Sequence, residues 1–310
     1  MKILLISYNR IGGTILATGL IRHLLEKHQK ASFSIITSTI AASIYQDMPR
    51  LDQLIIADKQ KYSMHWFKIW NVSRKTSWDL VIDLRSSSLA YFVSAKKRMI
   101  FYGNENEHKL EQLKSFIGST DDLSPGIWAN KDKYIELKKD KLLADKYICI
   151  APFSNSAVKD WSIENYINLL RNDFFNDYQI VLLGATSDES ELNNISKLIL
   201  KSSQNINNLI NNADMVETYF ILENSELFLG SDSSNMHLSV TASTPTLGLF
   251  GPTDEKLYGP LGKNNLSIRG VRSHIEIINE KDYKLGKIKS YLDDIKVAQV
   301  YKEIEKILKV

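Results

Sequence analysis

The stretch LGSDSSNMHL, residues 229–238, passes from the end of an apolar strand through small polar residues into an apolar helix. The first N–H groups of a helix have no partner within the helix, and together with the helix dipole they attract anions such as phosphate. Ser233 and Ser234 stand where this helix begins. The stretch therefore predicts a parallel α/β sheet with an anion site at a strand end, although an ordinary N-capped helix has the same residues.

The same order of strand, loop and helix extends through the second half of the chain. Apolar runs at 148–151, 179–184, 227–230 and 245–250 predict buried strands, and polar or glycine-containing loops follow them. Lys159, after the first of these strands, would reach the ligand edge of the sheet as a phosphate counter-charge, or it is a solvated lysine. Asp188 and Glu189, after the second, could bond ribose hydroxyls or could open a helix.

The first half repeats the pattern. A short apolar run at 2–6 meets a loop containing Gly12 and Gly13, then a stretch with helical spacing, and further strands are predicted at 33–36, 54–56 and 80–84. We therefore expect an α/β fold of two Rossmann-like domains facing a central cleft. The expected domains are residues 1–140 and 141–289, with a C-terminal helix within 290–310 that packs back on the N-terminal domain.

Composition narrows the class of protein. With 310 residues the chain has room for about two domains, and 44% hydrophobic with 24% charged residues is ordinary for a globular protein. A net charge of +3 is too small to indicate nucleic-acid binding. The single Cys149 lies in an apolar run, which predicts a buried thiol, and no run approaches the roughly 18 apolar residues of a membrane span. We therefore expect a cytoplasmic protein, and we expect it to use no cofactor. The histidines are scattered along the sequence, so we also expect no metal site.

Three motifs together resemble a known family. They are Lys159-Asp160-Trp161, the run from Asp232 to Leu238, and Phe250-Gly251-Pro252-Thr253-Asp254. In this order and spacing they resemble glycosyltransferase family 9, the ADP-heptose:lipopolysaccharide heptosyltransferases of GT-B fold. The resemblance implies an inverting transfer of heptose, or a related sugar, from ADP-heptose or another nucleotide sugar to a lipid-linked lipopolysaccharide core acceptor. The expected place of action is the cytoplasmic face of the inner membrane.

The resemblance also implies roles for individual residues. Lys159 would contact the phosphates and sugar of the donor, and Asp232 would touch the transferred sugar. Asp188, or Glu189, would hold the ribose. The remaining implied donor contacts are backbone groups, with the diphosphate held at Ser233, Ser234 and Asn235 and the adenine at Ala213 and Asp214.

The chain departs from the family's pattern at Gly13, at Gly19, where the following helix of the family has a proline, and at Ser234, where a glycine usually follows Asp-Ser. The first loop of the family reads Arg, any residue, Gly, Asp, and its Asp is the general base, whereas this chain has Gly12 followed by Gly13. Gly12 and Gly13 are expected to contact the donor. Asp83, at a strand end, is the candidate replacement base, or it has a structural role as cap of the next helix. If no base remains, the alternative is a catalytically weak or inactive nucleotide-sugar or glycan-binding relative.

Basic and aromatic residues alternate between Lys59 and Lys75, where Lys61 and Tyr62 precede Trp66 and Trp70. The two tryptophans share one helix face, which favours packing on the sheet, while contact with an anionic lipid surface is the alternative. Lys96-Lys97-Arg98 adds a second basic group, either a solvated turn or a contact for an acidic, phosphorylated glycolipid. Peripheral membrane contact is thus one expected property of the first domain.

Overall fold

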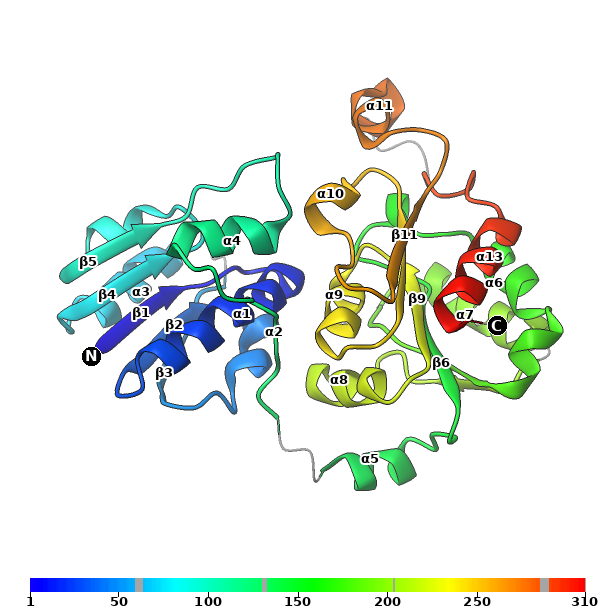
Figure 1. The fold of residues 1–310 in the computed structure, drawn as a ribbon, viewed down its shortest axis with the longest axis horizontal. Helices are drawn as coiled ribbons and strands as arrows, with labels where there is room; N and C mark the ends of the chain where they lie inside the picture. Colours follow the sequence, from blue (N-terminus) through cyan, green and yellow to red (C-terminus); the bar gives the residue numbers. More distant parts are fainter. Residues whose placement is uncertain (59–63, 130–132, 203, 285–289, 310) are drawn as a thin grey trace. The chain divides into compact units, whose positions relative to one another are not determined.

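The chain folds into two compact units. The structure, a computed structural model, describes residues 1–58, 64–129, 133–202, 204–284 and 290–309. The units are Met1–Ala129 and Asn130–Val310 (Figure 1). The boundary falls before helix α5 (Lys133–Asp140), not after residue 140 as predicted, because α5 packs against α8 (Met215–Glu223) of the second unit.

The first unit is a parallel sheet in the order β3-β2-β1-β4-β5. Its elements are β1 (Lys2–Ile6), α1 (Ile11–Lys27), β2 (Ser32–Thr37), α2 (Thr39–Ala42), η1 (Ser43–Tyr45), β3 (Leu51–Ile56), α3 (Met64–Ser73), β4 (Trp78–Asp83), η3 (Ser88–Tyr91), β5 (Ala95–Ile100) and α4 (Lys109–Ile117). Leu4 and Ile6 of β1 join the apolar cluster that includes α3, and the alternating Ile3 and Leu5 point to the opposite face, where α1 lies (Figure 1). Helices thus cover both faces of this sheet.

The second unit is a parallel sheet in the order β11-β10-β9-β6-β7-β8. Besides α5 and α8, its elements are β6 (Tyr147–Ala151), η4 (Ala157–Lys159), α6 (Ile163–Leu170), η5 (Asp173–Asp177), β7 (Gln179–Leu182), α7 (Glu189–Ser202), β8 (Ile206–Asn208), β9 (Leu227–Ser231), α9 (Ser234–Thr241), β10 (Thr246–Phe250), α10 (Glu255–Tyr258), β11 (Asn265–Arg269), α11 (His274–Asn279), α12 (Lys281–Lys284) and α13 (Val297–Leu308). Every residue of β6, β9 and β10 is buried, as expected for continuous apolar strands covered on both faces.

Helix α13 belongs to the second unit. Val300, Ile304 and Ile307 recur at the spacing of one helix face and pack into the apolar cluster that contains β6, β9 and α6. The indole Nε1 of Trp161 also donates to the carbonyl oxygen of Ile295 over 3.0 Å, just before α13 begins. The apolar face of this helix is therefore buried in its own unit, and packing of the helix on the N-terminal domain stays a prediction.

The strands expected at 2–6, 33–36, 54–56, 80–84 and at four places in the second half are confirmed, whereas β5, β8 and β11 were not predicted. Lys96-Lys97-Arg98 forms part of β5, an edge strand, and the Lys96 ammonium pairs with Asp79 over 2.7 Å, so the solvated-turn interpretation is wrong. Cys149 is buried as expected, and burial raises the pKa of its thiol to about 12.

The two tryptophans of α3 pack against the core of the first unit, as expected. The Arg85 guanidinium carbon lies over the Trp66 ring, 5.0 Å from the centroid of that ring. The indole Nε1 of Trp70 donates to the carbonyl oxygen of Phe92 over 2.9 Å. Lys59, Lys61 and Tyr62 lie outside the described residues. No helix of the described residues is long and apolar enough to cross a membrane.

Candidate functional site

The candidate site lies where the strand order of the second unit reverses. The chain enters the sheet at β6, adds β7 and β8 on one side, and returns to add β9 on the other. Because β6 and β9 are parallel neighbours, the loops that follow them start side by side and then diverge, which is where ligands bind in open α/β sheets. The first loop carries Lys159 and the second carries Asp232 and Ser233.

Lys159 and Asp232 form an ion pair across these two loops. The Lys159 Nζ lies 2.7 Å from Asp232 Oδ2, and the side chains are 25% and 10% exposed. The other carboxylate oxygen of Asp232 is 3.7 Å from Nε2 of His237, whose ring meets the Tyr258 ring edge to face. A partly dehydrated lysine at a strand end has a stronger electrostatic effect on a bound anion than a solvated one. The structure therefore brings together two of the predicted site residues.

The start of α9 is the second part of the site. Ser233 is the N-cap, with extended backbone and no hydrogen bond from its side chain to the helix. The hydroxyl oxygens of Ser231 and Ser233 are buried without a hydrogen-bond partner. By contrast, α8 and α11 begin with complete capping boxes, at Asp214 and Ser273. The first turn of α9, with Ser234 and Asn235, thus presents backbone N–H groups and hydroxyls that the protein itself does not use, as an anion cradle requires.

Asp160 and Trp161 position the lysine beside them. Asp160 Oδ1 accepts from the backbone N–H of Ser154 over 2.7 Å, and the Asp160 carbonyl oxygen accepts from the Ser290 hydroxyl over 2.5 Å. Burial raises the pKa of Asp160 to about 6. Trp161 is 1% exposed and anchors the loop in the core. In the Lys-Asp-Trp motif only the lysine points to the site, a division of roles that the sequence did not indicate.

The loop after β10 is held rigidly at the same edge of the sheet. Arg269 of β11 donates to the carbonyl oxygens of Gly251 and Thr253 and, from Nε over 2.9 Å, to Glu255. Burial alone would raise the pKa of Glu255, but the hydrogen bonds and charge of Arg269 outweigh it and lower that pKa. Asp254 caps α10 by accepting from the N–H of Lys256. The contribution of Arg269, which fixes this loop, was not predicted from the sequence.

Asp188 lies on another loop, after β7. Its Oδ1 accepts from the backbone N–H groups of Ser190 and Glu191 at 2.8 and 3.1 Å. Asp188 therefore caps the start of α7, which was the alternative to ribose binding in the sequence analysis. The loop is tied to the one after β8 because Asn211 exchanges two hydrogen bonds with the backbone of Thr186. Asp188 is exposed, and its role as a ribose ligand stays a prediction.

Asp83, Gly12 and Gly13 lie in the first unit. Asp83 is fully buried, and its carboxylate accepts from the N–H of Arg85 over 2.8 Å and from the N–H and hydroxyl of Ser87 over 2.7 Å each. This is the structural role kept open for Asp83, and its role as general base stays a prediction. Gly12 and Gly13 form the first turn of α1.

Two Rossmann-like units with a candidate anion site on the second have the GT-B fold, and two solved structures of glycosyltransferases share this fold. The chain belongs to glycosyltransferase family 9 (heptosyltransferase), whose family model matches residues 107–285. The matched part contains Lys159, Asp188 and the start of α9. The protein is therefore an enzyme of the glycosyltransferase class.

Individual relatives are distant. A lipooligosaccharide heptosyltransferase 2 from Campylobacter jejuni is 22% identical over 99% of both chains. A glycosyl transferase family 9 structure from Veillonella parvula has a TM-score of 0.82 at 19% identity and covers 99% of this chain and 97% of its own. The structure of the E. coli heptosyltransferase WaaC with ADP has a TM-score of 0.74 at 15% identity and covers 99% and 100%. At these identities the solved structures support the fold alone.

Proposed function

We propose that this glycosyltransferase moves heptose, or a related sugar, from an ADP-sugar to the core of a lipid-linked lipopolysaccharide precursor, with inversion at the anomeric carbon. The observation that carries the proposal is the Lys159–Asp232 pair beside the start of α9, where the Ser231 and Ser233 hydroxyls have no partner in the protein. The names of the relatives, lipooligosaccharide heptosyltransferase and a heptosyltransferase with ADP, support the sugar, the nucleotide and the acceptor class.

The second unit would hold the donor and stabilise the leaving group. When the bond between the anomeric carbon and the diphosphate breaks, negative charge grows on the departing ADP. The N–H groups at the start of α9 and the Lys159 ammonium would stabilise that charge without reorganising. Asp232, held between Lys159 and His237, would accept a hydrogen bond from a hydroxyl of the transferred sugar. Ser231 and Ser233 supply two further hydroxyls.

Inversion also requires a base for the acceptor hydroxyl. Asp83 is the candidate, because Gly13 stands at the position of the family's base. Asp83→Asn tests it. Since the carboxylate also holds the turn at Arg85 and Ser87, the melting temperature must be measured with the rate. Loss of transfer by a factor of about 10² to 10⁴ in a protein of unchanged melting temperature would support the base. Unchanged transfer would exclude it.

The second candidate function is a nucleotide-sugar or glycan-binding relative with little or no turnover. It is favoured by Gly13 and by the complete burial of Asp83, which leave no exposed acid at either position. Calorimetry with ADP-heptose and ADP, with UDP-glucose as the control nucleotide sugar, measures binding. Transfer to an isolated lipopolysaccharide core precursor measures turnover, and the anomeric configuration of the product, read by NMR, tests inversion. Binding of ADP-heptose without transfer favours the second candidate, and no binding contradicts both.

The expected place of action is the cytoplasmic face of the inner membrane, because the proposed acceptor is anchored in lipid. A lipid-linked sugar confined to a membrane surface requires an enzyme that meets that surface. The expected place of action follows from the lipid anchor of the acceptor, and it does not depend on the residues of the donor site.

A further inference from the structure

Four aromatic side chains stand out from the surface of the first unit. Phe67, Tyr91, Phe92 and Tyr102 are 60%, 62%, 69% and 68% exposed. They come from α3, from η3 and its end, and from the segment after β5. Single exposed apolar residues are common on soluble proteins, whereas a contiguous group usually marks a binding surface. The question is therefore whether these four are contiguous.

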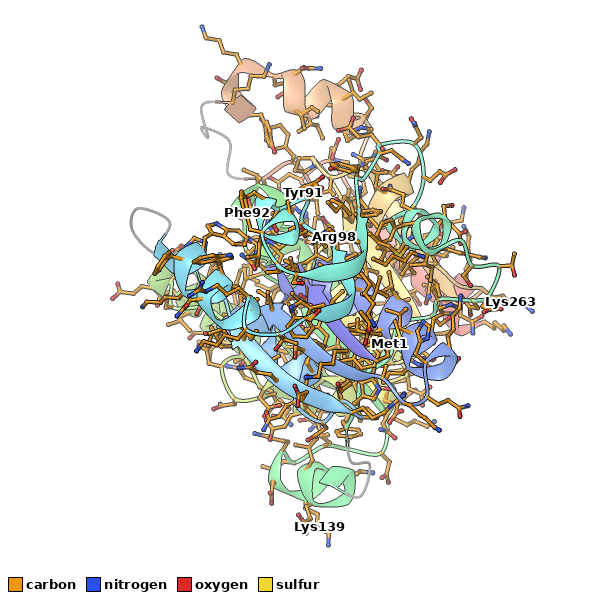
Figure 2. The ribbon with its side chains drawn as sticks, turned by 90° about the vertical axis from the view of Figure 1, so that its left-hand side faces the viewer. Met1, Tyr91, Phe92, Arg98, Lys139 and Lys263 are labelled. Carbon is orange, nitrogen blue, oxygen red and sulfur yellow. The ribbon has the colours of Figure 1, made fainter. Side chains whose placement is uncertain are left out.

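Ring contacts and hydrogen bonds join them around Trp70. The Phe67 ring lies 5.8 Å from the Trp70 ring between centroids, and the Trp70 indole donates to the carbonyl oxygen of Phe92. The hydroxyl groups of Tyr91 and Tyr102 are 3.3 Å apart. Figure 2 shows Tyr91 and Phe92 close to Arg98 on this side of the unit. The four residues form one surface, which we call the aromatic surface.

The stretch of chain that carries the aromatic surface is positively charged. Residues 64–104 contain seven Lys or Arg and two Asp, a net charge of +5, whereas the whole chain carries +3, so all other residues together carry −2. The two acids are already used, because Asp79 pairs with Lys96 and Asp83 is buried in its own turn. Lys68, Lys75 and Lys97 are exposed.

Two arginines attach this charge directly to the aromatic residues. Arg98 donates to the carbonyl oxygens of Ala90 and Val93, on either side of Tyr91 and Phe92, over 2.9 and 2.7 Å. The Arg74 guanidinium lies 4.5 Å from the centroid of the Trp70 ring. The cations and the aromatic side chains thus form one face, and not two patches that happen to share a domain.

We propose that this aromatic and basic face docks on the surface of a bilayer with anionic headgroups. Aromatic rings favour the boundary between headgroups and acyl chains, and lysines near the surface are attracted to anionic lipid. Charge complementarity selects this occupant over a second copy of the chain, since two such faces would repel each other. The membrane contact considered for Trp66 and Trp70 is thereby assigned to other side chains, because those two indoles pack inward.

The docking face deepens the proposed function, on which it rests, by naming the surface that meets a lipid-linked acceptor. Sedimentation of the full-length protein with vesicles tests it. The vesicles contain phosphatidylcholine alone or phosphatidylcholine mixed with phosphatidylglycerol. We expect binding to the anionic vesicles that weakens as salt is raised, and little binding to the neutral ones.

Two variants remove the two halves of the face. Lys68→Gln with Lys75→Gln should weaken binding to anionic vesicles about 25-fold, at about fivefold per lysine. Tyr91→Ser with Phe92→Ser should also weaken it at least tenfold, because two rings of this size leave the interface. The matched controls are Lys139→Gln with Lys263→Gln, labelled in Figure 2, and Leu200→Ser, which is 82% exposed on α7. The controls should bind as the parent does.

Three outcomes would overturn the proposal. They are equal binding to neutral and anionic vesicles, parent-like binding by both variants, and an equal loss of binding by the controls. Calorimetry with ADP-heptose on the same proteins separates this proposal from the proposed function, because the docking variants should keep the donor affinity of the parent. A parent that binds anionic vesicles but no ADP-heptose contradicts the proposed donor and leaves the docking surface standing. The reverse result contradicts the docking surface alone.

Discussion

Lys159 is the residue whose removal should separate donor binding from folding. Its ammonium faces Asp232 at the start of α9, and a quarter of its side chain is exposed. We expect Lys159→Ala to weaken use of the donor about 100-fold, because a cation leaves the diphosphate site. The free energy of unfolding should fall by about 1 to 3 kcal/mol, because the mostly buried Asp232 loses its cation. Calorimetry with ADP and urea unfolding measure the two effects.

The control for this variant is Lys139→Ala, which removes an exposed lysine from α5. Lys159→Arg adds a second comparison, because it keeps the charge but changes the geometry of the contact. Equal ADP affinity in Lys159→Ala and the parent would remove Lys159 from the donor site.

Asp160 should make folding stability depend on pH. Burial raises its pKa in the folded protein to about 6, above its ordinary value. Between about pH 4 and pH 6 the folded state therefore binds more protons at this group than the unfolded state, so the contribution of Asp160 to stability falls as the pH rises. Its full size is roughly 3 kcal/mol, from about two pKa units.

Asp160→Asn, which keeps an oxygen for the Ser154 N–H, should abolish this dependence. Urea unfolding of parent and variant at pH 4.5 and pH 7 gives the comparison, because all other titrating groups are shared. The variant should gain stability relative to the parent as the pH rises. A constant difference between the two proteins would show that Asp160 has an ordinary pKa.

The two central residues of the site were predictable singly but not as a pair. Lys159 and Asp232 are 73 positions apart, and each follows an apolar run that ends in a loop. Only the sheet order, with β6 beside β9, places the two loops together. The sequence also could not show that Asp160 turns away from the ligand and into the protein, since that depends on Ser154 and Ser290.

At the scale of elements, Gly19 allows helix α1 to approach the backbone around Leu123 closely. A Cβ on Gly19 would lie 1.8 Å from the Leu123 carbonyl oxygen, and the adjacent Thr18 hydroxyl accepts from the N–H of Gly126 over 3.0 Å. Gly19→Ala should therefore destabilise the first unit by about 2 kcal/mol or more, although alanine favours a helix by about 1 kcal/mol. The departure at Gly19 from the family's proline thus has a packing reason.

The comparison for Gly19→Ala is Gly103→Ala. Its added Cβ would lie 3.1 Å from the flexible Nζ of Lys109, which can move. Thermal unfolding of both variants should show a lower melting temperature for Gly19→Ala alone. A parent-like melting temperature for Gly19→Ala would show that the segment at Leu123 shifts without loss.

Element prediction failed where the pattern of hydrophobicity was ambiguous. Strand β5 contains Lys96-Lys97-Arg98, which has no alternation of apolar and polar residues, because an edge strand can expose several consecutive side chains. Helix α13 has a clear apolar face, but amphipathicity does not say which unit covers it. The buried strands β6, β9 and β10 were predictable because every side chain in them is apolar or small.

For the whole molecule, two separate cores predict two unfolding transitions. One apolar cluster lies within Met1–Ala129 and the other within Asn130–Val310, and the Lys159–Asp232 pair at the start of α9 belongs to the second unit. In differential scanning calorimetry we expect ADP at 100 times its dissociation constant to stabilise the transition of the second unit by about 2.7 kcal/mol. The transition of the first unit should not move.

Lys159→Ala serves as the control for that measurement, because it should lose most of the shift at the same ADP concentration. A single transition that moves as a whole would show that the two cores unfold as one cooperative unit.

The buried thiol of Cys149 makes this chain suited to optical measurement. It is the single cysteine in the sequence, it is fully buried, and a thiol with a pKa of about 12 is almost never a thiolate at neutral pH. Maleimide dyes should therefore not react with Cys149, so this core residue does not have to be replaced before labelling. Cysteines introduced at exposed Ser94 and Lys263 would carry a donor and an acceptor fluorophore, one on each unit. Energy transfer between them would report, in real time, how the spacing of the two units responds to ADP.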